Sequence, residues 1–189
     1  MAQETRLFLL RHAPVIGPAG VIHASDASAD LSDRKRLTEL RARLPESAIC
    51  YASPSRRTMA TAGALGLDPI AVAEFREQNF GDWTGQRHDD LAASGGAAYA
   101  RFWSDPAHSR PPGGESFADQ VARVAPALKA ISDAGAILVV HSGTIRAILS
   151  IALDLAPQNA LRFVIDPLSL TRIDRIGHTW RIGAVNQSL

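Results

Sequence analysis

Four short runs of apolar residues are spaced along the chain, each bounded by polar residues, glycine or proline. They are about four to six residues long, and they do not alternate between apolar and polar positions. This pattern is typical of buried strands rather than of amphipathic helices. We therefore predict strands within residues 6–10, 48–53, 70–75 and 136–141. A further strand pair is predicted around "RIGH", at 169–174 and 179–185.

Segments with apolar residues at helical spacing separate these strands. Leucines at helical spacing before Pro45 predict a helix, and the proline should end it. Ser116 and Asp119 have the spacing of a capping box, and Pro126 should kink or split the helix that follows them. Buried strands that alternate with helices indicate a three-layer α/β/α sandwich around a mostly parallel sheet, with helices on both faces. The other helices are predicted at 54–65, 86–93, 96–104 and 143–153.

Composition narrows the class of protein. The 189 residues suffice for one domain with a full core, and we expect a single domain over residues 1–189. A formal net charge of +1 gives no reason to expect nucleic acid or an acidic membrane surface as partner. Cys50 is the one cysteine, so an internal disulfide is excluded and a reducing compartment is favoured. With neither a signal peptide nor a membrane span in the pattern, we expect a soluble, cytoplasmic protein.

The two most apolar strands both stop at a histidine. "LFLLRH" ends at His12, after Arg11, and "AILVVHSG" delivers His141. The carboxyl ends of parallel strands form the binding edge of such a sheet, so both imidazoles should lie over one crevice. A third strand ends in "SPSRR", which adds Arg56 or Arg57. Two histidines, two arginines and free helix N-termini suit a dianion, and guanidinium groups match phosphate oxygens in pairs.

These motifs resemble the histidine phosphatases, also called the phosphoglycerate mutase-like superfamily. Five stretches match in the family's order, from residue 7 to about 149, so we expect the phosphoglycerate mutase-like fold. The tail "PLSLTRI" is also similar. The five stretches are "LLRHAP", "SPSRRTMATA", "EQNFGDWTG", "PPGGESFADQVARV" and "VVHSGTIRAIL".

The resemblance implies a role for each matching residue. His12 corresponds to the nucleophile that takes the phosphoryl group as a phosphohistidine, and Glu77 to the proton donor of the leaving alcohol. His141 corresponds to the second histidine, which steadies the transferring group. The implied phosphate-binding residues are Arg11, Arg57, His141 and the backbone N–H of Ser142.

The residue types fit this chemistry in their own right. A neutral imidazole is a good nucleophile, and a covalent intermediate divides one difficult displacement into two easier steps. Phosphoryl transfer otherwise needs positioning and positive charge around the equatorial oxygens, while a carboxylic acid can protonate a poor leaving group. This chemistry requires no metal and no cofactor, and we expect none.

The chain departs from the family pattern at two positions. Ala13 replaces the usual glycine after the nucleophile, a small change. Pro18 stands where many members place a phosphate-binding asparagine, so we expect another residue to replace that ligand, for example from the 20–28 loop.

Several other polar or aromatic residues have plain structural explanations. Arg56 and Arg146 are expected to be structural or surface residues, with a carboxylate as a partner for Arg146. Adjacent positions of "RHDDL" point in different directions on a helix, which argues against a metal site. The aromatic side chains expected in the core or the pocket wall are Trp83, Phe102 and Trp103.

Three functions remain open at this stage. A phosphomonoesterase acting on a small phosphorylated metabolite is favoured, because a mutase usually has longer segments that close the site. "NFGDWTGQRHDDL" and "GGESF" are similar to the α-ribazole-5′-phosphate phosphatases, which suggests one candidate substrate. The alternatives are a phosphoglycerate mutase-type phosphoryl transferase and a member of the family that binds phosphorylated ligands without turnover.

Overall fold

The computed structural model describes residues 4–94 and 96–188, and its centre is a six-stranded sheet with strand order β3-β2-β4-β1-β5-β6. The first four strands in this order run parallel to one another, whereas β5 is antiparallel to both of its neighbours, β1 and β6. The prediction of a mostly parallel sheet is therefore confirmed. The strands are β1 (Glu4–Arg11), β2 (Ile49–Ala52), β3 (Ile70–Ala71), β4 (Gly135–Val140), β5 (Leu170–Ile176) and β6 (Thr179–Gln187).

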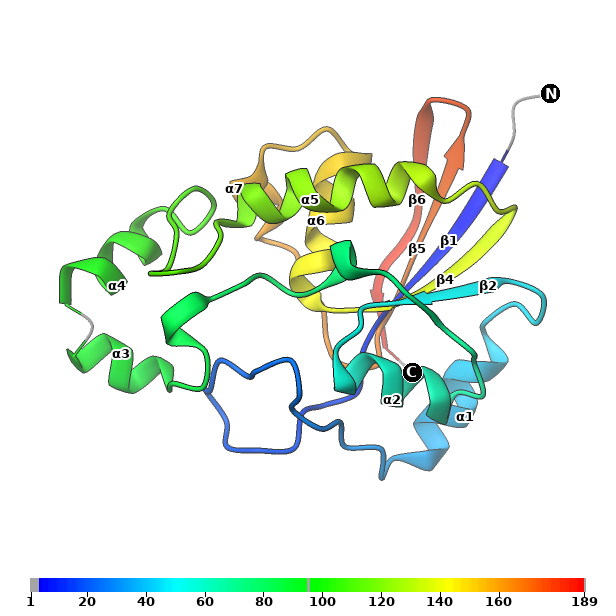
Figure 1. Ribbon diagram of the computed structural model, residues 1–189. Helices are drawn as coiled ribbons and strands as arrows, with labels where there is room; N and C mark the ends of the chain where they lie inside the picture. Colours follow the sequence, from blue (N-terminus) through cyan, green and yellow to red (C-terminus); the bar gives the residue numbers. More distant parts are fainter. Residues whose placement is uncertain (1–3, 95, 189) are drawn as a thin grey trace.

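Helices cover both faces of this sheet, which gives the predicted three layers (Figure 1). Successive side chains of β4 point to opposite faces. Leu138 and Val140 pack in a cluster with residues of α5 and α6, while Ile137 and Val139 pack with residues of α1 and α2. The helices are α1 (Arg34–Ala42), α2 (Arg56–Ala64), α3 (His88–Ser94), α4 (Gly96–Ser104), α5 (Phe117–Ala130), α6 (Ser142–Ala152) and α7 (Pro157–Ala160), with 3₁₀ turns η1 (Ala73–Phe75) and η2 (Gly81–Trp83).

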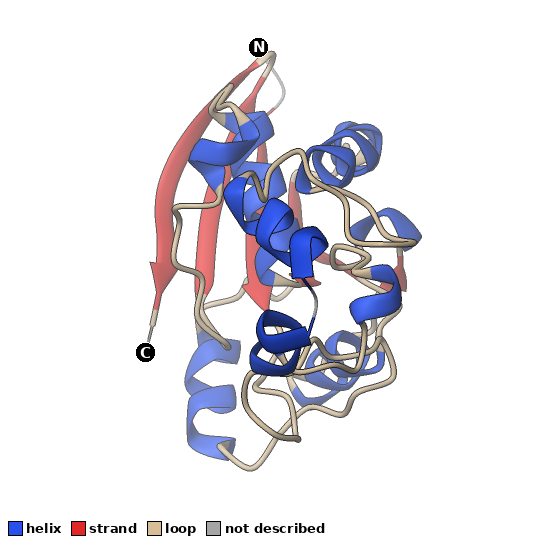
Figure 2. Cartoon of the chain, turned by 90° about the vertical axis from the view of Figure 1, so that its left-hand side faces the viewer, coloured by secondary structure: helices blue, strands red, loops and turns tan. Residues whose placement is uncertain are grey.

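Helices α3 and α4 lie away from the sheet, at one end of the molecule (Figure 1). The quarter-turned view shows strands lying side by side, with β6 at the edge of the sheet leading to the C-terminus (Figure 2). A small apolar cluster of Ile22, Trp83, Leu91 and Phe102 holds this end together. Trp103, expected in the core or pocket wall, is instead 51% exposed beside this cluster.

Two expected element boundaries are wrong, for local reasons. The helix predicted from Pro54 begins at Arg56, because Ser55 keeps an extended conformation and occupies the N-cap. The strand predicted over 70–75 shrinks to Ile70–Ala71, because β3 pairs only with the end of β2 and the chain then turns into η1. This turn buries Phe75 and directs the next residues toward the ends of the strands.

Helix α5 begins with the predicted capping box, in which Ser116 and Asp119 each accept a hydrogen bond from the other's backbone N–H. The helix continues across Pro126 without splitting. Within the described residues, no helix has the length and apolar character needed to span a membrane.

Candidate active site

Two histidines meet where neighbouring parallel strands end. His12 directly follows β1 and His141 directly follows β4, and these strands pair in register up to their last residues. The two ring centroids are 5.1 Å apart, and the rings meet edge to face at 68°. His12 is 4% exposed and His141 is fully buried. The predicted convergence of the two imidazoles is confirmed.

The backbone fixes which nitrogen of His12 carries a proton. Nδ1 lies 2.7 Å from the carbonyl oxygen of Ala13, which can only accept, so Nδ1 must donate. Nε2 then holds a lone pair, and Nε of Arg57 donates to it over 3.2 Å. Burial lowers the pKa of His12 to about 3; the nearby ring of His141 and the positive charges of Arg57 and Arg11 act in the same direction. The imidazole is therefore neutral at neutral pH, with a lone pair on Nε2.

Two arginines stand beside this lone pair. Arg57, in the first turn of α2, is 5% exposed, whereas its neighbour Arg56 is exposed. Arg57 is anchored by a 2.8 Å hydrogen bond to the carbonyl of Ala24, and Arg11 donates to the carbonyl of Ile165. Burial lowers the pKa of Arg57 and Arg11, and the charge of Glu77 acts in the opposite direction.

Glu77 lies between η1 and η2, and four donors hold its carboxylate, among them the hydroxyl of Ser142, which donates to Oε2 over 3.4 Å. Gly143 N–H, at the start of α6, donates to Oε2 over 3.2 Å. Gln78 N–H and the side-chain amide of Gln120 donate to Oε1 over 3.0 and 3.2 Å. Gln120 is fully buried on α5 and also donates to the carbonyl of Arg76. Oε2 is thus held by α6, and Oε1 is held by α5 and by the N–H of Gln78.

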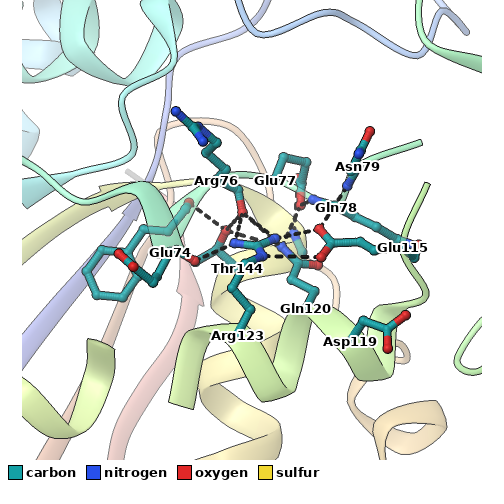
Figure 3. A network of polar contacts seen from close by, with 12 residues as sticks. Glu74, Arg76, Glu77, Gln78, Asn79, Glu115, Asp119, Gln120, Arg123 and Thr144 are labelled. Carbon is teal, nitrogen blue, oxygen red and sulfur yellow. Dashed lines mark hydrogen bonds and ion pairs between the residues drawn. The ribbon is translucent and has the colours of Figure 1, made fainter. Parts of the chain in front are cut away.

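The segment that carries Glu77 is fastened to α5 as a whole (Figure 3). Arg123 donates to both carboxylate oxygens of Glu115 and to the carbonyls of Glu74 and Arg76. Glu115 in turn accepts from the backbone N–H of Asn79. The chain on both sides of Glu77 is therefore fixed by one partly buried ion pair, which keeps the carboxyl group of Glu77 in place relative to the histidines.

A cavity of about 790 Å³ opens above these groups. Its floor contains His12, Arg11 and Arg57, and Glu77 and Ser142 lie on its wall. The rest of the wall comes from the 15–25 loop, the segment after β3, His88 and α5. The further lining residues are Val15, Val21, Ile22, His23, Ala24, Ser25, Ser55, Ala73, Arg76, Gln78, Asn79, Phe80, Thr84, His88, Glu115 and Arg123.

The floor of the cavity is suited to an anion. Arg11 and Arg57 bring two positive charges against the single carboxylate of Glu77. Nε of Arg11 and Nδ1 of His141 are buried and have no hydrogen-bond partner among the described residues. Buried polar atoms are nearly always paired in proteins, so the unpaired atoms on Arg11, which lines the cavity, and on His141, whose ring packs against His12, suit a bound ligand.

The structure brings together the candidate catalytic and phosphate-binding residues. Arg11, His12, Arg57, Glu77 and Ser142 line the cavity, and the ring of His141 packs edge to face against that of His12.

Other polar residues have the structural roles expected of them, with one correction. Arg146 bonds to the carbonyl of Phe163 rather than to the expected carboxylate. In "RHDDL", His88 contacts the hydroxyl of Tyr99 and Asp89 pairs with Arg87. Over residues 4–94 and 96–188, no three His, Cys, Asp or Glu side chains are grouped to hold a metal ion.

Part of the 20–28 loop, from which a replacement for the ligand missing at Pro18 is expected, lines the cavity. Pro18 is exposed and does not line the cavity, whereas His23 does. Burial, followed by the charge of Arg57, lowers the pKa of His23, so a neutral imidazole stands on this side of the cavity.

Three residues of the site were missed from the sequence: Ser53, Gln120 and Gly143. For Gln120 a signal existed, because its spacing from Phe117 and Val124 puts a polar amide on the apolar face of α5. A fully buried polar side chain on such a face must satisfy another group, here Glu77. Ser53 and Gly143 act through contacts between segments that are distant in the sequence, and no local sequence pattern predicts such contacts.

The neutral histidines make stability depend on pH. In the unfolded chain a histidine gains its proton near pH 6.5, whereas folded His12 does so only near pH 3, and burial keeps the pKa of His141 low as well. Their contribution to stability is therefore complete above pH 6.5 and is lost as pH falls toward 3. Each histidine lowers the free energy of unfolding by about 1.4 kcal/mol per pH unit in this range. Urea unfolding at pH 7.5, 6 and 5 measures the slope.

His12→Ala should make this slope shallower, since one of the two groups is removed. Equal stability of the wild type at pH 7.5 and 5 would contradict the neutral, buried state of both rings. The range above pH 5 keeps the titration of carboxylates out of the comparison.

Gly143 leaves the space that the carboxylate of Glu77 occupies. A Cβ at this position would lie 2.1 Å from Oε1 of Glu77 and 2.9 Å from Oε1 of Gln120. Both are ends of side chains that can move, so Gly143→Ala should fold while displacing Glu77. A shift of about 1 Å at a reacting group costs about 10²-fold in rate. We expect a loss of that size in phosphate release from an alkyl phosphate, measured as kcat.

The matched control is Gly63→Ala on α2, where an added Cβ meets nothing within 4 Å. This variant should keep its activity and gain up to about 1 kcal/mol in helix stability. Full activity in Gly143→Ala would show that the position of Glu77 is not critical.

The sequence matches the profile of the Histidine phosphatase superfamily (branch 1) over residues 7–188. Among curated proteins, it is 29% identical over 106 residues to a 2,3-bisphosphoglycerate-dependent phosphoglycerate mutase of Azorhizobium caulinodans, covering 53% of this chain and 52% of that protein. A protein of the same name from Methylobacterium is 36% identical over 85 residues, 41% of each chain. The chain thus spans about half the length of these curated relatives, or less.

Solved structures match over nearly the whole chain. A structure titled a putative alpha-ribazole-5′-P phosphatase from Escherichia coli has a TM-score of 0.88 and 20% identity, with 97% of this chain and 96% of the other covered. A mycobacterial glucosyl-3-phosphoglycerate phosphatase has a TM-score of 0.83 and 25% identity, with 98% and 100% covered. At 20% identity the first of these shows the shared fold.

Proposed function

Because the chain belongs to the histidine phosphatase superfamily, we propose that it is a metal-independent phosphomonoesterase that forms a phosphohistidine on His12 and acts on a small phosphorylated metabolite. The observation that carries this proposal is the state of His12. Its Nε2 lone pair lies at the floor of the cavity, its Nδ1 proton is fixed by Ala13, and a guanidinium group stands 3.2 Å from the lone pair.

In the first step, Nε2 of His12 attacks phosphorus and the bond from phosphorus to the leaving oxygen breaks. Arg11 and Arg57 bind the equatorial oxygens, where negative charge must be stabilised. Glu77 gives its proton to the leaving oxygen, so that an alcohol departs. We assign Ser142 N–H and His141 as further donors to the phosphoryl oxygens.

In the second step, water attacks the phosphohistidine. Glu77, now a carboxylate, takes a proton from the water, and the bond between phosphorus and Nε2 of His12 breaks. Inorganic phosphate leaves, and His12 is again a neutral imidazole with its lone pair on Nε2. One side chain thus serves as acid in the first step and as base in the second.

Access of water favours hydrolysis over return of the phosphoryl group to an organic acid. Ser25, Arg76 and Thr84 line the cavity and are exposed, so solvent reaches it directly. A mutase must keep water away from its phosphohistidine between the two transfers. The mutase remains the second candidate because the curated relatives carry that name, although they match over only part of their length.

The wall of the cavity offers two surfaces to the leaving group. Val21, Ile22 and Phe80 give an apolar side, and Arg76 and Asn79 a polar side. This combination fits a metabolite with both a flat or apolar part and hydroxyl or acidic groups. α-Ribazole-5′-phosphate has a planar ring system and a sugar, and we place it first in a substrate screen.

The test of the proposed function is phosphate release from p-nitrophenyl phosphate in excess EDTA. Turnover that survives chelation supports the metal-independent mechanism, and loss of turnover with EDTA overturns it. A protein that retains phosphate esters but releases no phosphate from any of them is a binding member of the family. Conversion of 3-phosphoglycerate in the presence of 2,3-bisphosphoglycerate, without release of phosphate, would establish the mutase.

A further inference from the structure

Ser53 is a buried hydroxyl at the site that the mechanism above does not use. It directly follows β2, is fully buried, and its backbone N–H donates to the carbonyl of Val139. Its Oγ lies 2.8 Å from Nε2 of His141, a short contact for an oxygen and a nitrogen. The direction of this hydrogen bond therefore determines whether the other nitrogen of His141, Nδ1, carries a proton.

His141 is neutral in the folded protein. Burial keeps its pKa well below the ordinary value, and the positive charges of Arg57, Arg11 and Arg123 act in the same direction. A neutral imidazole has one N–H, on either Nε2 or Nδ1. If Nε2 carried it, the buried Nδ1 would face a phosphate oxygen with a lone pair, which repels it. A neutral His141 can assist a phosphoryl group only with its proton on Nδ1.

The proton of the Ser53 hydroxyl has two acceptors within reach. Nε2 of His141 is 2.8 Å away, whereas the hydroxyl of Ser55 is 3.2 Å away. The backbone N–H of Ser55 approaches the Ser53 oxygen from another side, at 3.4 Å, and occupies one of its lone pairs. The shorter contact favours donation from Ser53 to the imidazole.

We propose that Ser53 is a positioning residue: its hydroxyl donates to Nε2 of His141 and so fixes the imidazole proton on Nδ1, where it binds an oxygen of the transferring phosphoryl group. This accounts for Nδ1 of His141 being buried without a partner among the described residues. The inference rests on the proposed function.

Both histidines then carry their proton on Nδ1. His12 acts through its free Nε2, whereas His141 acts through its Nδ1 proton. In His12, Ala13 accepts from Nδ1, which frees Nε2 to attack. In His141, Ser53 donates to Nε2, which frees the Nδ1 proton to bind. Nucleophile and donor can therefore both be neutral, and no charge has to be placed on a second buried ring.

The test is the ¹⁵N spectrum of the imidazole nitrogens, which distinguishes the two tautomers, recorded for the wild type and for Ser53→Ala. We expect His141 of the wild type to carry its proton on Nδ1 and the variant to shift toward Nε2–H. Because the donor acts on the charge that develops during transfer, kcat should fall about 10²–10³-fold while KM changes little. Ser53→Thr keeps the hydroxyl and should restore both the tautomer and kcat.

Ser150→Ala is the matched control, since it removes another buried serine hydroxyl, bonded to the carbonyl of Leu155 and remote from the cavity. It should change neither the spectrum of His141 nor kcat. An Nε2–H tautomer in the wild type overturns the inference. So does a loss of kcat in Ser53→Ala with an unchanged tautomer, because that would mean a structural role alone. Absence of phosphate release by the wild type would instead overturn the proposed function. The ¹⁵N spectrum would still show which nitrogen of His141 carries the proton.

Discussion

Replacing His12 by alanine is expected to abolish phosphate release, with a fall in kcat of about 10⁴-fold or more. The variant lacks the lone pair that attacks phosphorus in the proposed mechanism, and His141 cannot replace it. His141 is 5.1 Å away ring to ring, but its Nε2 is engaged by Ser53. The arginines should still bind the ester, so the dissociation constant of the substrate should change far less than kcat. Stopped assays with p-nitrophenyl phosphate measure the rate, and phosphate binding by calorimetry measures the affinity.

A second readout identifies the atom that carries the phosphoryl group. Wild-type protein quenched in alkali during turnover of a ³²P-labelled ester should retain label that acid removes, as expected for a phosphorus–nitrogen bond. His12→Ala should retain none. His108→Ala is the control, since His108 is exposed and pairs with Asp105. Label that persists in His12→Ala would place the nucleophile elsewhere.

The centre of this site could be predicted from the sequence because it depends on local patterns at strand ends. A buried strand that stops at a histidine leaves few places for the imidazole, and the parallel arrangement brings His12 and His141 to the same edge. The choice between Arg56 and Arg57 was open from residue type alone. The helical turn settles it, since only one of two adjacent side chains can face the sheet.

The support around Glu77 could not be predicted in the same way. Its donors come from α5, from α6 and from the backbone N–H of Gln78, and they meet only once these elements pack. The early end of β3 also depends on how distant elements pack. An edge strand of two residues satisfies its pairing with β2, and burial of Phe75 then sets the direction of the chain. Local propensity favours a longer strand there, and tertiary packing overrides it.

Glu77→Gln is expected to separate substrates by their leaving groups. The amide keeps the shape of the carboxyl group and can accept from Gly143, but it has no proton to give. An alkyl alcohol leaves poorly without protonation, so kcat for an alkyl phosphate should fall about 10²–10⁴-fold. p-Nitrophenolate is stable as an anion, so formation of the phosphohistidine from its ester should slow by about tenfold or less. The two rates are compared by following release of the alcohol in a single turnover.

Glu74→Gln provides the matched control, because Glu74 is exposed on the same segment and contributes its backbone carbonyl to the bond with Arg123. It should leave both rates unchanged. Equal losses for both esters in Glu77→Gln would mean that the carboxylate binds or orients the substrate rather than protonating the leaving oxygen. In that case Gly143→Ala should also slow both esters equally, since it displaces the same group. Selective loss in both variants would tie proton donation to the position of Glu77, which α5 and α6 set together.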